Sequence, residues 1–321
     1  MPCPAQRTSK EVLLSTQVGF IGLGAIGKWM ALNIARHFPL TVYDIRQEPL
    51  KELASAGACV ASSSREVAAA SDVLITMVRT YAQTREVFEG MDGALRDLRR
   101  GAVVVVMSTI SPHQARELGA TVSAVGASLL DSPVSGGYLR AVEGTLTLMV
   151  GGPSEALNAC RPVLETMATN IFHIGPQVGL GQAAKNINNM LLGIQEVGAS
   201  EAMVLGVKAG IDPRLLYEVI THSTGDSWAF RNRMDRVITR DFETRGALEI
   251  LVKDLGIALS MADDLEMRLM LAPIALKAYQ EAMASGLGEE DDSAVVKAIE
   301  MNAGVEVRPV DDHPPLSEKK T

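Results

Sequence analysis

The sequence predicts an α/β domain with a parallel sheet over residues 16–178, followed by an all-helical domain over residues 179–305. The chain has 321 residues, which is more than one hydrophobic core usually serves. Short apolar runs alternate with helical patterns in the first half, as they do where helices cover both faces of a parallel sheet. Strand-like runs stop after about residue 174, and helical periodicity then continues alone.

In the first half, apolar runs of strand length predict strands at residues 17–23, 40–44, 73–78, 102–107, 128–131 and 145–150. The pattern of residues 25–37 predicts a helix directly after the first strand. Gly151, Gly152 and Pro153 then break the regular pattern. The alternation of strand and helix over this half is what favours a parallel sheet.

In the second half, residues 179–210 contain no proline and predict one long helix that begins the helical domain. Asp212-Pro213 predicts the next helix start, with the aspartate as cap and the proline in the first turn. Residues 242–262 and 272–284 also have helical periodicity. At the ends of the chain, we interpret residues 1–15 as a loose leader and residues 306–321 as a disordered tail.

The composition and charge exclude several classes of protein. Hydrophobic residues make up 47% of the chain and charged residues 21%, which is typical of a globular protein. The net charge of −8 gives no general attraction to nucleic acid or to an anionic membrane, and the longest apolar run is too short to span a bilayer. The cysteines and histidines show neither CxxC nor HExxH spacing. We therefore expect a cytoplasmic protein that binds no metal.

The segment Gly22-Leu23-Gly24-Ala25-Ile26-Gly27 has the GxGxxG pattern between a predicted strand and a predicted helix. Gly22 would make the tight turn, Gly24 would let the backbone approach a pyrophosphate, and Gly27 would let helix and strand pack closely. The N–H groups at the helix start would bind the phosphates. An ordinary glycine-rich turn is the alternative, but the strand and helix on either side favour a dinucleotide-binding Rossmann unit.

Asp44 lies at the end of the next predicted strand and is expected to select the cofactor. Its carboxylate can accept hydrogen bonds from a ribose hydroxyl and would repel a 2′-phosphate, so the sequence favours NAD over NADP. Two alternatives stay open. Asp44 could be a turn residue that ends a strand, and Arg46 could recruit a phosphate.

Two further motifs carry candidate chemistry. Ser135, Gly136 and Gly137 follow a predicted strand end and can present a hydroxyl and backbone N–H groups to a small carboxylate; the alternative is a tight turn that uses glycine for positive φ. Lys185 and Asn189 are four residues apart, and hence lie on one face of the long helix. Apolar neighbours would favour a neutral Lys185 that can accept a proton from a hydroxyl, although most helix lysines are simply on the surface.

These motifs, followed by Lys253-Asp254-Leu255, stand in the order typical of one family. From about residue 17 to residue 299 the chain resembles the β-hydroxyacid dehydrogenases, which include 3-hydroxyisobutyrate dehydrogenase and tartronate semialdehyde reductase. The resemblance implies a Rossmann domain joined to a helical domain, and homodimers or homotetramers built through the helices. It also implies hydride transfer between a small carboxylate substrate and NAD or NADP.

The resemblance implies a role for each motif. Lys185 would be the catalytic acid/base and Asn189 its partner at the substrate. The substrate carboxylate would be held by Ser135, Gly136 and Gly137. The cofactor would be bound by Gly22, Gly24, Gly27, Asp44, Val78, Thr109 and Lys253. For Lys253 the alternative is a helix-surface charge capped by its neighbour Asp254.

Finer features bear on the substrate. Residues 226–234 and 288–295 resemble the same stretches of the family's L-threonate dehydrogenases. Side chains of the first stretch could instead be core aromatics or solvated cations, namely Trp228, Phe230, Arg231 and Arg233. The chain departs from many members at Val78-Arg79, beside the expected adenosine, and at Arg140, which could face the substrate entrance or lie in solvent.

The sequence therefore predicts a NAD-dependent dehydrogenase in which Lys185 exchanges a proton with a small hydroxy acid such as L-threonate. Within the family, 3-hydroxyisobutyrate and tartronate semialdehyde are the alternative substrates. A protein of a different class, which senses the dinucleotide without turnover, would keep Asp44 and the glycines but would not need Lys185.

Overall fold

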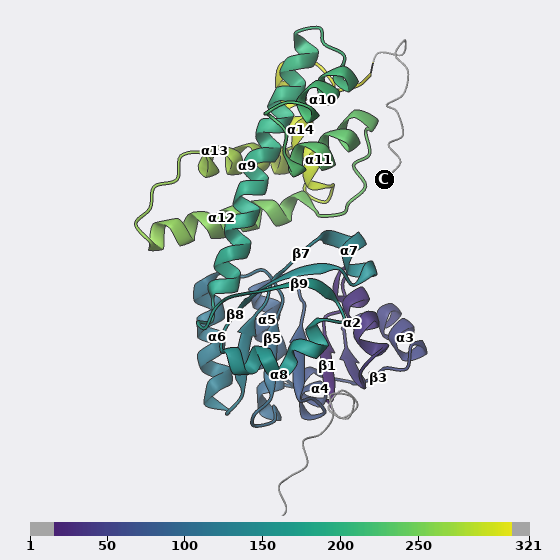
Figure 1. Cartoon of the computed structure of the whole chain (residues 1–321), viewed down its shortest axis with the longest axis vertical. Helices are drawn as coiled ribbons and strands as arrows, with labels where there is room; N and C mark the ends of the chain where they lie inside the picture. The colour runs from purple at the N-terminus through teal and green to yellow at the C-terminus, as the bar shows by residue number, and fades with distance from the viewer. Residues whose placement is uncertain (1–15, 310–321) are drawn as a thin grey trace, which may run out of the picture. The chain divides into compact units, whose positions relative to one another are not determined.

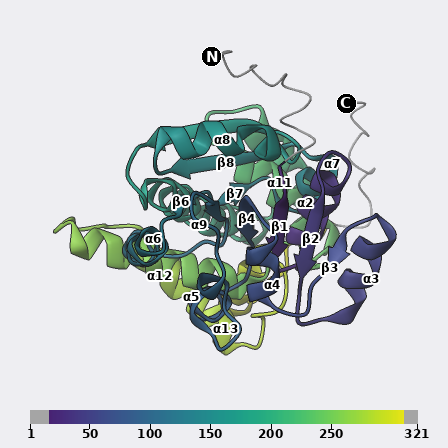
Figure 2. The ribbon, with the colours of Figure 1, turned by 90° about the horizontal axis from the view of Figure 1, so that it is seen from below.

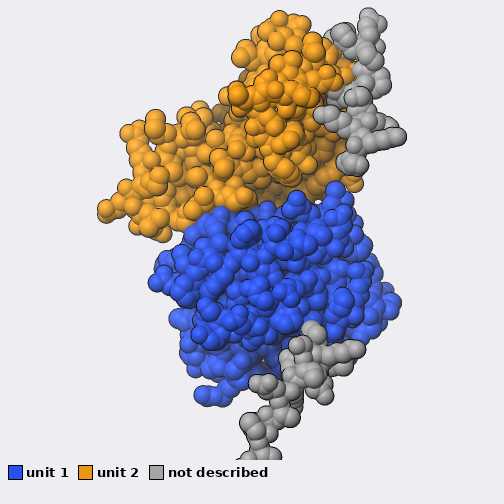
Figure 3. All heavy atoms as spheres, viewed as in Figure 1, with its two compact units in different colours: residues 1–185 blue, residues 186–321 orange. Residues whose placement is uncertain are grey.

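The computed structural model describes residues 16–309, so the expected leader and most of the expected tail lie outside the described residues. The chain forms two compact units, residues 1–185 and residues 186–321 (Figure 3). The division falls inside the long helix α9 (Leu180–Lys208), whereas the sequence places the domain boundary at residues 178 and 179. The first turn and a half of α9, which ends with Lys185, therefore belongs to unit 1.

Unit 1 is built on a sheet whose first six strands are parallel. They lie in the order β3-β2-β1-β4-β5-β6. Their bounds are β1 (Val18–Ile21), β2 (Leu40–Tyr43), β3 (Cys59–Val60), β4 (Val73–Thr76), β5 (Val103–Val106) and β6 (Ser128–Asp131). The winding direction reverses between β1 and β4, and ligands of such sheets bind at the carboxyl ends of the strands beside this reversal.

The far edge of the sheet is mixed rather than parallel. The strands here are β7 (Val134–Ser135), β8 (Leu146–Gly151) and β9 (Ala168–Gly175), joined by helices α7 (Gly137–Glu143) and α8 (Ser154–Leu164). β8 runs antiparallel to β6 and β7, and β9 runs parallel to β8. The predicted parallel sheet is confirmed for the first six strands, whereas β8 adds an antiparallel strand at the far edge. The short α7 connection explains the difference, because a parallel crossover needs a dozen or more residues.

Helices cover both faces of the sheet, as the alternating pattern predicts. One face packs against α8 and against α2 (Gly27–Ala35) and α3 (Gln47–Ser55), and the other against α4 (Ser64–Ala69), α5 (Tyr81–Glu89) and α6 (Pro112–Ala124) (Figure 2). In β5, Val103 and Val105 join the first core, and Val104 and Val106 join the second. Burial of each valine stabilises the fold by roughly 1.5–3 kcal/mol.

Unit 2 is helical in its described part (Figure 1). After α9 come α10 (Pro213–Thr221), α11 (Trp228–Thr239), α12 (Leu248–Asp264), α13 (Ala272–Ala284) and α14 (Val295–Ala303). Asp212 caps α10 as predicted, because its side chain accepts hydrogen bonds from the N–H groups of Arg214 and Leu215. The helix predicted from residue 242 begins only at Leu248. The residues just before α12 are held in a non-helical conformation instead, because the Asp291 carboxylate accepts the Arg245 N–H at 3.0 Å.

By length and hydropathy alone, α9 would be able to cross a bilayer. Several polar side chains along it are nevertheless buried against other elements of the protein. In unit 1 the Gln182 side chain contacts the backbone of Ser108, and in unit 2 Glu196 accepts a hydrogen bond from Tyr279. We therefore interpret α9 as a core helix whose apolar surface serves packing.

The interior of unit 2 contains a buried charged cluster. Arg233 lies between two carboxylates, with Nη2 2.8 Å from Asp292 Oδ2 and Nε 3.4 Å from Glu196 Oε1. Burial raises the pKa of Glu196 well above its usual range, and it raises that of Asp292 to about 6 against the attraction of Arg233. The alternative that Arg233 is solvated is therefore wrong, whereas Arg231 is exposed. Phe230 is a core aromatic, and Trp228 is 58% exposed.

This cluster predicts a loss of stability as the pH rises. Because the folded pKa of Asp292 lies above the unfolded value, the folded chain holds a proton that the unfolded chain releases, between about pH 4 and pH 6. The Asp292→Asn variant cannot ionise, so its unfolding free energy relative to the parent protein should increase over this window. Urea unfolding at several pH values measures the difference. Asp97→Asn is the control, because the lowered pKa of Asp97 confines its contribution to below about pH 4, where the slope is opposite, and its unfolding free energy relative to the parent protein should stay nearly constant between about pH 4 and pH 6.

Candidate active site

The glycine loop between β1 and α2 fits a dinucleotide pyrophosphate. Gly22 has φ +96°, and a Cβ there would meet the Met77 carbonyl oxygen at 2.4 Å. A Cβ on Gly27 would meet the Gly22 carbonyl oxygen at 2.2 Å, whereas one on Gly24 would meet nothing within 4 Å. No side chain caps the start of α2, and the Lys28 N–H donates to the Gly24 carbonyl at 3.1 Å. The backbone is thus open where a phosphate would approach and tight where helix and strand pack.

Asp44 follows β2 and is bound to this loop. Its Oδ2 accepts the Leu23 N–H at 2.6 Å, and its Oδ1 accepts the Arg46 N–H at 2.8 Å. The Arg46 side chain also contacts Oδ1, with Nε at 3.1 Å, and donates from Nη2 to the Leu23 carbonyl at 2.8 Å. Burial tends to raise the pKa of Asp44, but the hydrogen bonds from Arg46 and Leu23 lower it overall. The carboxylate is therefore charged and fixed beside the glycine loop.

Val78 and Thr109 follow the neighbouring strands β4 and β5. The Val78 N–H donates to Ser108 Oγ at 3.0 Å, which joins the two strand ends directly. Ser108 is buried, and Thr109 beside it is partly exposed. The glycine loop, Asp44, Val78 and Thr109 all follow the carboxyl ends of parallel strands, so unit 1 brings them to one edge of its sheet.

The Ser135–Gly137 segment lies at the start of α7. Ser135 pairs with Thr147 of β8, and both glycines have positive φ, +132° at Gly136 and +67° at Gly137. The glycines are exposed, and a Cβ on Gly137 would meet nothing within 4 Å. The segment is thus a tight turn that glycine permits. Its backbone is open at Gly137, whereas a Cβ on Gly136 would meet the Arg140 side chain at 2.7 Å.

Lys185 lies one and a half turns into α9 and is partly buried. The start of α9 is held by Asp131, whose two carboxylate oxygens accept the N–H groups of Gly179 at 2.6 Å and Gln182 at 2.7 Å. Burial raises the pKa of Asp131 to about 7, although these two hydrogen bonds favour its charged form. Lys185 therefore belongs to a helical segment fixed to the end of β6.

In unit 2, Asn189 and Lys253 bind the same carboxylate. Asn189 Nδ2 donates to Asp254 Oδ2 at 2.6 Å, and Lys253 Nζ lies 2.6 Å from Asp254 Oδ1. Asp254 is almost completely buried. Lys253 is therefore paired with its neighbour, as the surface alternative expected, but the pair is also tied to Asn189.

The residues that sequence reasoning did not single out are Asp131, Gln182 and Asp254. Each is buried and binds a segment that carries a predicted site residue. Asp131 and Asp254 stand inside motifs quoted for the family, so their position beside Ser135 and Lys253 was an available signal. For Gln182 the signal was a large amide among small residues at the start of a helix.

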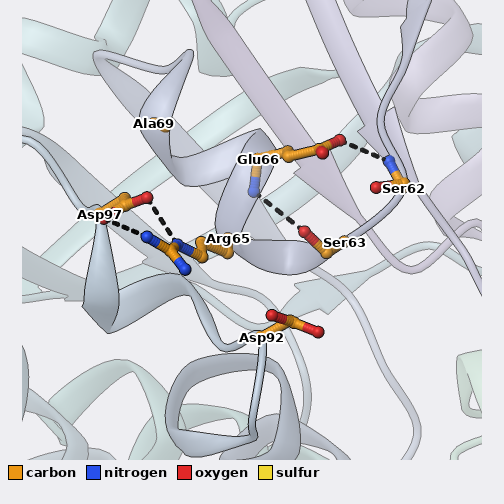
Figure 4. Close-up of a pocket in the computed structure, with 7 residues that line it drawn as sticks. All are labelled: Ser62, Ser63, Arg65, Glu66, Ala69, Asp92 and Asp97. Carbon is orange, nitrogen blue, oxygen red and sulfur yellow. Dashed lines mark hydrogen bonds and ion pairs between the residues drawn. The ribbon is translucent and has the colours of Figure 1, made fainter.

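A surface hollow of about 410 Å³ lies at the start of α4 (Figure 4). Three of its charged side chains have partners: Arg65 Nε lies 2.6 Å from Asp97 Oδ2, and Glu66 Oε2 accepts the Ser62 N–H at 2.8 Å. None of the predicted site residues lines it. We interpret the hollow as part of the capped N-terminus of α4 and not as a binding site.

A parallel sheet with this strand order and glycine loop, followed by the helix that carries Lys185, defines a dinucleotide-binding protein of the Rossmann class. Residues 17–175 match the family model described as the NAD-binding domain of 6-phosphogluconate dehydrogenase. Residues 179–299 match the model described as the NAD-binding domain of NADP-dependent 3-hydroxyisobutyrate dehydrogenase.

Individual relatives agree with these models over nearly the whole chain. L-threonate dehydrogenase of Cupriavidus necator is 39% identical over 88% of this chain and 96% of its own. Mouse mitochondrial 3-hydroxyisobutyrate dehydrogenase is 37% identical over 89% of this chain and 88% of its own. The crystal structure of 3-hydroxyisobutyrate dehydrogenase from Salmonella typhimurium is 38% identical, with a TM-score of 0.81 over 88% of this chain and 99% of that one.

The chain belongs to the β-hydroxyacid dehydrogenase family. The predicted family, the Rossmann and helical fold, and the activity of an oxidoreductase on CH–OH groups are confirmed. The use of a nicotinamide dinucleotide, NAD or NADP, and of a small hydroxy acid is confirmed as well. The roles of the individual site residues stay predictions.

Proposed function

We propose that the chain oxidises a small sugar acid, with L-threonate as the first candidate, and that Lys185 is its acid/base. The observation that carries this proposal is that the helix segment bearing Lys185 is bound to the end of a sheet strand. Asp131 holds the start of α9 to the end of β6, beside the strand ends where a dinucleotide binds in this fold. The similarity to L-threonate dehydrogenases supports the choice of substrate.

The chain's own residues bind the substrate and move the proton. Ser135, Gly136 and Gly137 hold the substrate carboxylate with a hydroxyl and backbone N–H groups. Neutral Lys185 accepts the proton of the substrate hydroxyl, and protonated Lys185 returns it to the carbonyl oxygen in the reverse direction. Bound NAD supplies the acceptor for the hydride.

Asn189 is the partner of Lys185 in this proposal. The two side chains lie one turn apart on one face of α9, and Asp254 fixes the Asn189 amide by accepting from its nitrogen. The amide oxygen accepts from Asn188 Nδ2 at 3.1 Å, and its second lone pair would accept from the substrate hydroxyl. Lys253, held by the same carboxylate, would serve the cofactor.

NAD is the proposed cofactor, with NADP used less well. The support is Asp44, whose charged carboxylate lies beside the glycine loop and would repel a 2′-phosphate. Arg46 is already paired with Asp44, which reduces its capacity to bind that phosphate.

Initial rates with NAD and with NADP, measured against L-threonate, 3-hydroxyisobutyrate and D-glycerate, test the proposal. We expect the highest kcat/KM with NAD and L-threonate. A higher value with 3-hydroxyisobutyrate or D-glycerate would replace L-threonate by that substrate and leave the chemistry in place. Tight NAD binding without turnover of any hydroxy acid would contradict the proposal and favour a dinucleotide sensor.

We further propose a cytoplasmic homodimer or homotetramer that forms through unit 2. Apolar side chains are exposed on α9 and α10, namely Ile187, Leu191, Leu205, Leu215 and Val219, and such surfaces mark protein contacts. Sedimentation equilibrium should give a mass of two or four chains. A monomer at micromolar concentration would contradict this proposal.

A further inference from the structure

Gln182 is a buried glutamine on the first turn of α9, and its side chain contacts the segment that follows β5. Its Oε1 accepts the Ile110 N–H at 3.0 Å, and its Nε2 donates to the Ser108 carbonyl at 2.8 Å. The two backbone groups flank Thr109 on either side. The glutamine amide therefore binds the backbone around Thr109 in the way that a neighbouring strand would.

The contacts of Gln182 extend to three adjacent strand ends. Its backbone N–H donates to Asp131 at the end of β6, at 2.7 Å. Ser108, at the end of β5, accepts from the Val78 N–H beyond the end of β4. Gln182 thus joins the start of α9 to the ends of β4, β5 and β6, and all of these contacts lie within unit 1.

The chemistry of this position requires an amide. Ser108 presents an acceptor and Ile110 a donor, and a glutamine side chain offers the matching donor and acceptor in one flat group. Both residues are buried, so removing the amide takes away hydrogen bonds that bulk water does not readily replace. The helix start is also pressed against the sheet, because a Cβ on Gly181 would meet the Met149 carbonyl oxygen at 2.2 Å. Little space therefore remains for the helix to shift.

We propose that Gln182 is a positioning residue, which fixes the backbone around Thr109 relative to Lys185. Lys185 follows Gln182 by three residues, less than one turn of the same helix. The inference rests on the proposed role of Lys185 and on the placement of Thr109 beside the cofactor. Small displacements between reacting groups lower rates strongly, so Gln182 acts on the reaction through the two segments that it joins.

The Gln182→Leu variant tests the proposal, because leucine keeps much of the volume and removes both hydrogen bonds. We expect kcat to fall by about tenfold or more and the Kd of NAD, measured by calorimetry, to rise by about fivefold or more. The KM of the hydroxy acid should change by less than about threefold, because Ser135 and its glycines are untouched.

The matched control is Gln114→Leu. Gln114 also accepts a backbone N–H, that of Ser111 at 2.9 Å, but in the cap of α6. This variant should lower thermal stability and leave kcat and the Kd of NAD within about twofold of the parent values. Equal kinetic losses in the two variants would attribute the effect to general destabilisation and overturn the proposal.

Gln182→Glu separates positioning from a purely structural role, and it also serves if the leucine variant does not fold. One carboxylate oxygen can still accept from Ile110, but the other then faces the Ser108 carbonyl, and two acceptors repel. Protonation restores the missing donor. The ratio of its kcat to that of the parent enzyme should therefore rise as the pH falls from about 8 to about 5.5. A ratio that does not change with pH would overturn the proposal.

Failure of the proposed function is distinguishable from failure of this inference. If the parent enzyme oxidises no hydroxy acid, the proposed function fails, and the role of Gln182 is then tested by the Kd of NAD alone. If the parent enzyme is active but Gln182→Leu keeps kcat and the Kd of NAD within about twofold, the positioning role fails and the proposed function stands.

Discussion

Replacing Lys185 by alanine is expected to lower kcat for hydroxy-acid oxidation by about 10²–10⁴-fold, the usual contribution of a general acid/base. The affinity for NAD should stay within about twofold, because the glycine loop and Asp44, which are proposed to bind the dinucleotide, are untouched. Initial-rate kinetics and calorimetric titration measure the two quantities. Activity is lost because the variant has no side chain in place of Lys185 to accept the proton of the substrate hydroxyl.

Two further variants make the test of Lys185 specific. Lys185→Arg keeps the positive charge, but a guanidinium does not deprotonate and so cannot act as a base. It should therefore lose about as much activity as the alanine variant. Lys208→Ala removes an exposed lysine at the far end of the same helix and should keep the parent kcat. A Lys185→Ala enzyme that retained most of its kcat would contradict the proposed role.

The sequence predicted those features of unit 1 that depend on local patterns. The strand β5 is a run of four valines whose alternate side chains enter the two cores. Gly22 has the positive φ that a tight turn after β1 requires. Asp212 caps α10 with its side chain, as the Asp-Pro pair indicates. In each case the cause and the structure lie within a few residues of one another.

Features that depend on distant partners were not predictable in this way. Gln182 meets Ser108 across 74 positions of sequence, and Asn189 meets Asp254 across 65. Arg233 is buried because Glu196 and Asp292 reach it from other elements. The sequence around a polar helix residue does not show whether that residue has such a distant partner. The sequence therefore indicated the groups that we propose to react, whereas the residues that hold them became visible only in the structure.

Replacing Asp44 by alanine is expected to change the preference for the cofactor rather than the chemistry. The change removes the carboxylate that repels a 2′-phosphate, and it releases the Arg46 guanidinium from its contacts with Asp44 Oδ1 and Oδ2. The ratio of kcat/KM with NAD to kcat/KM with NADP should fall by about 100-fold, the equivalent of roughly 2.7 kcal/mol. Initial rates at a saturating hydroxy-acid concentration measure this ratio.

The double variant Asp44→Ala/Arg46→Ala separates the two causes. Loss of repulsion alone would leave NADP usable at a rate similar to that of the single variant. If Arg46 binds the phosphate once it is free, the double variant should lose most of the gain with NADP and keep the loss with NAD. An unchanged preference in Asp44→Ala would show that cofactor selection does not depend on this carboxylate, despite its place beside the glycine loop.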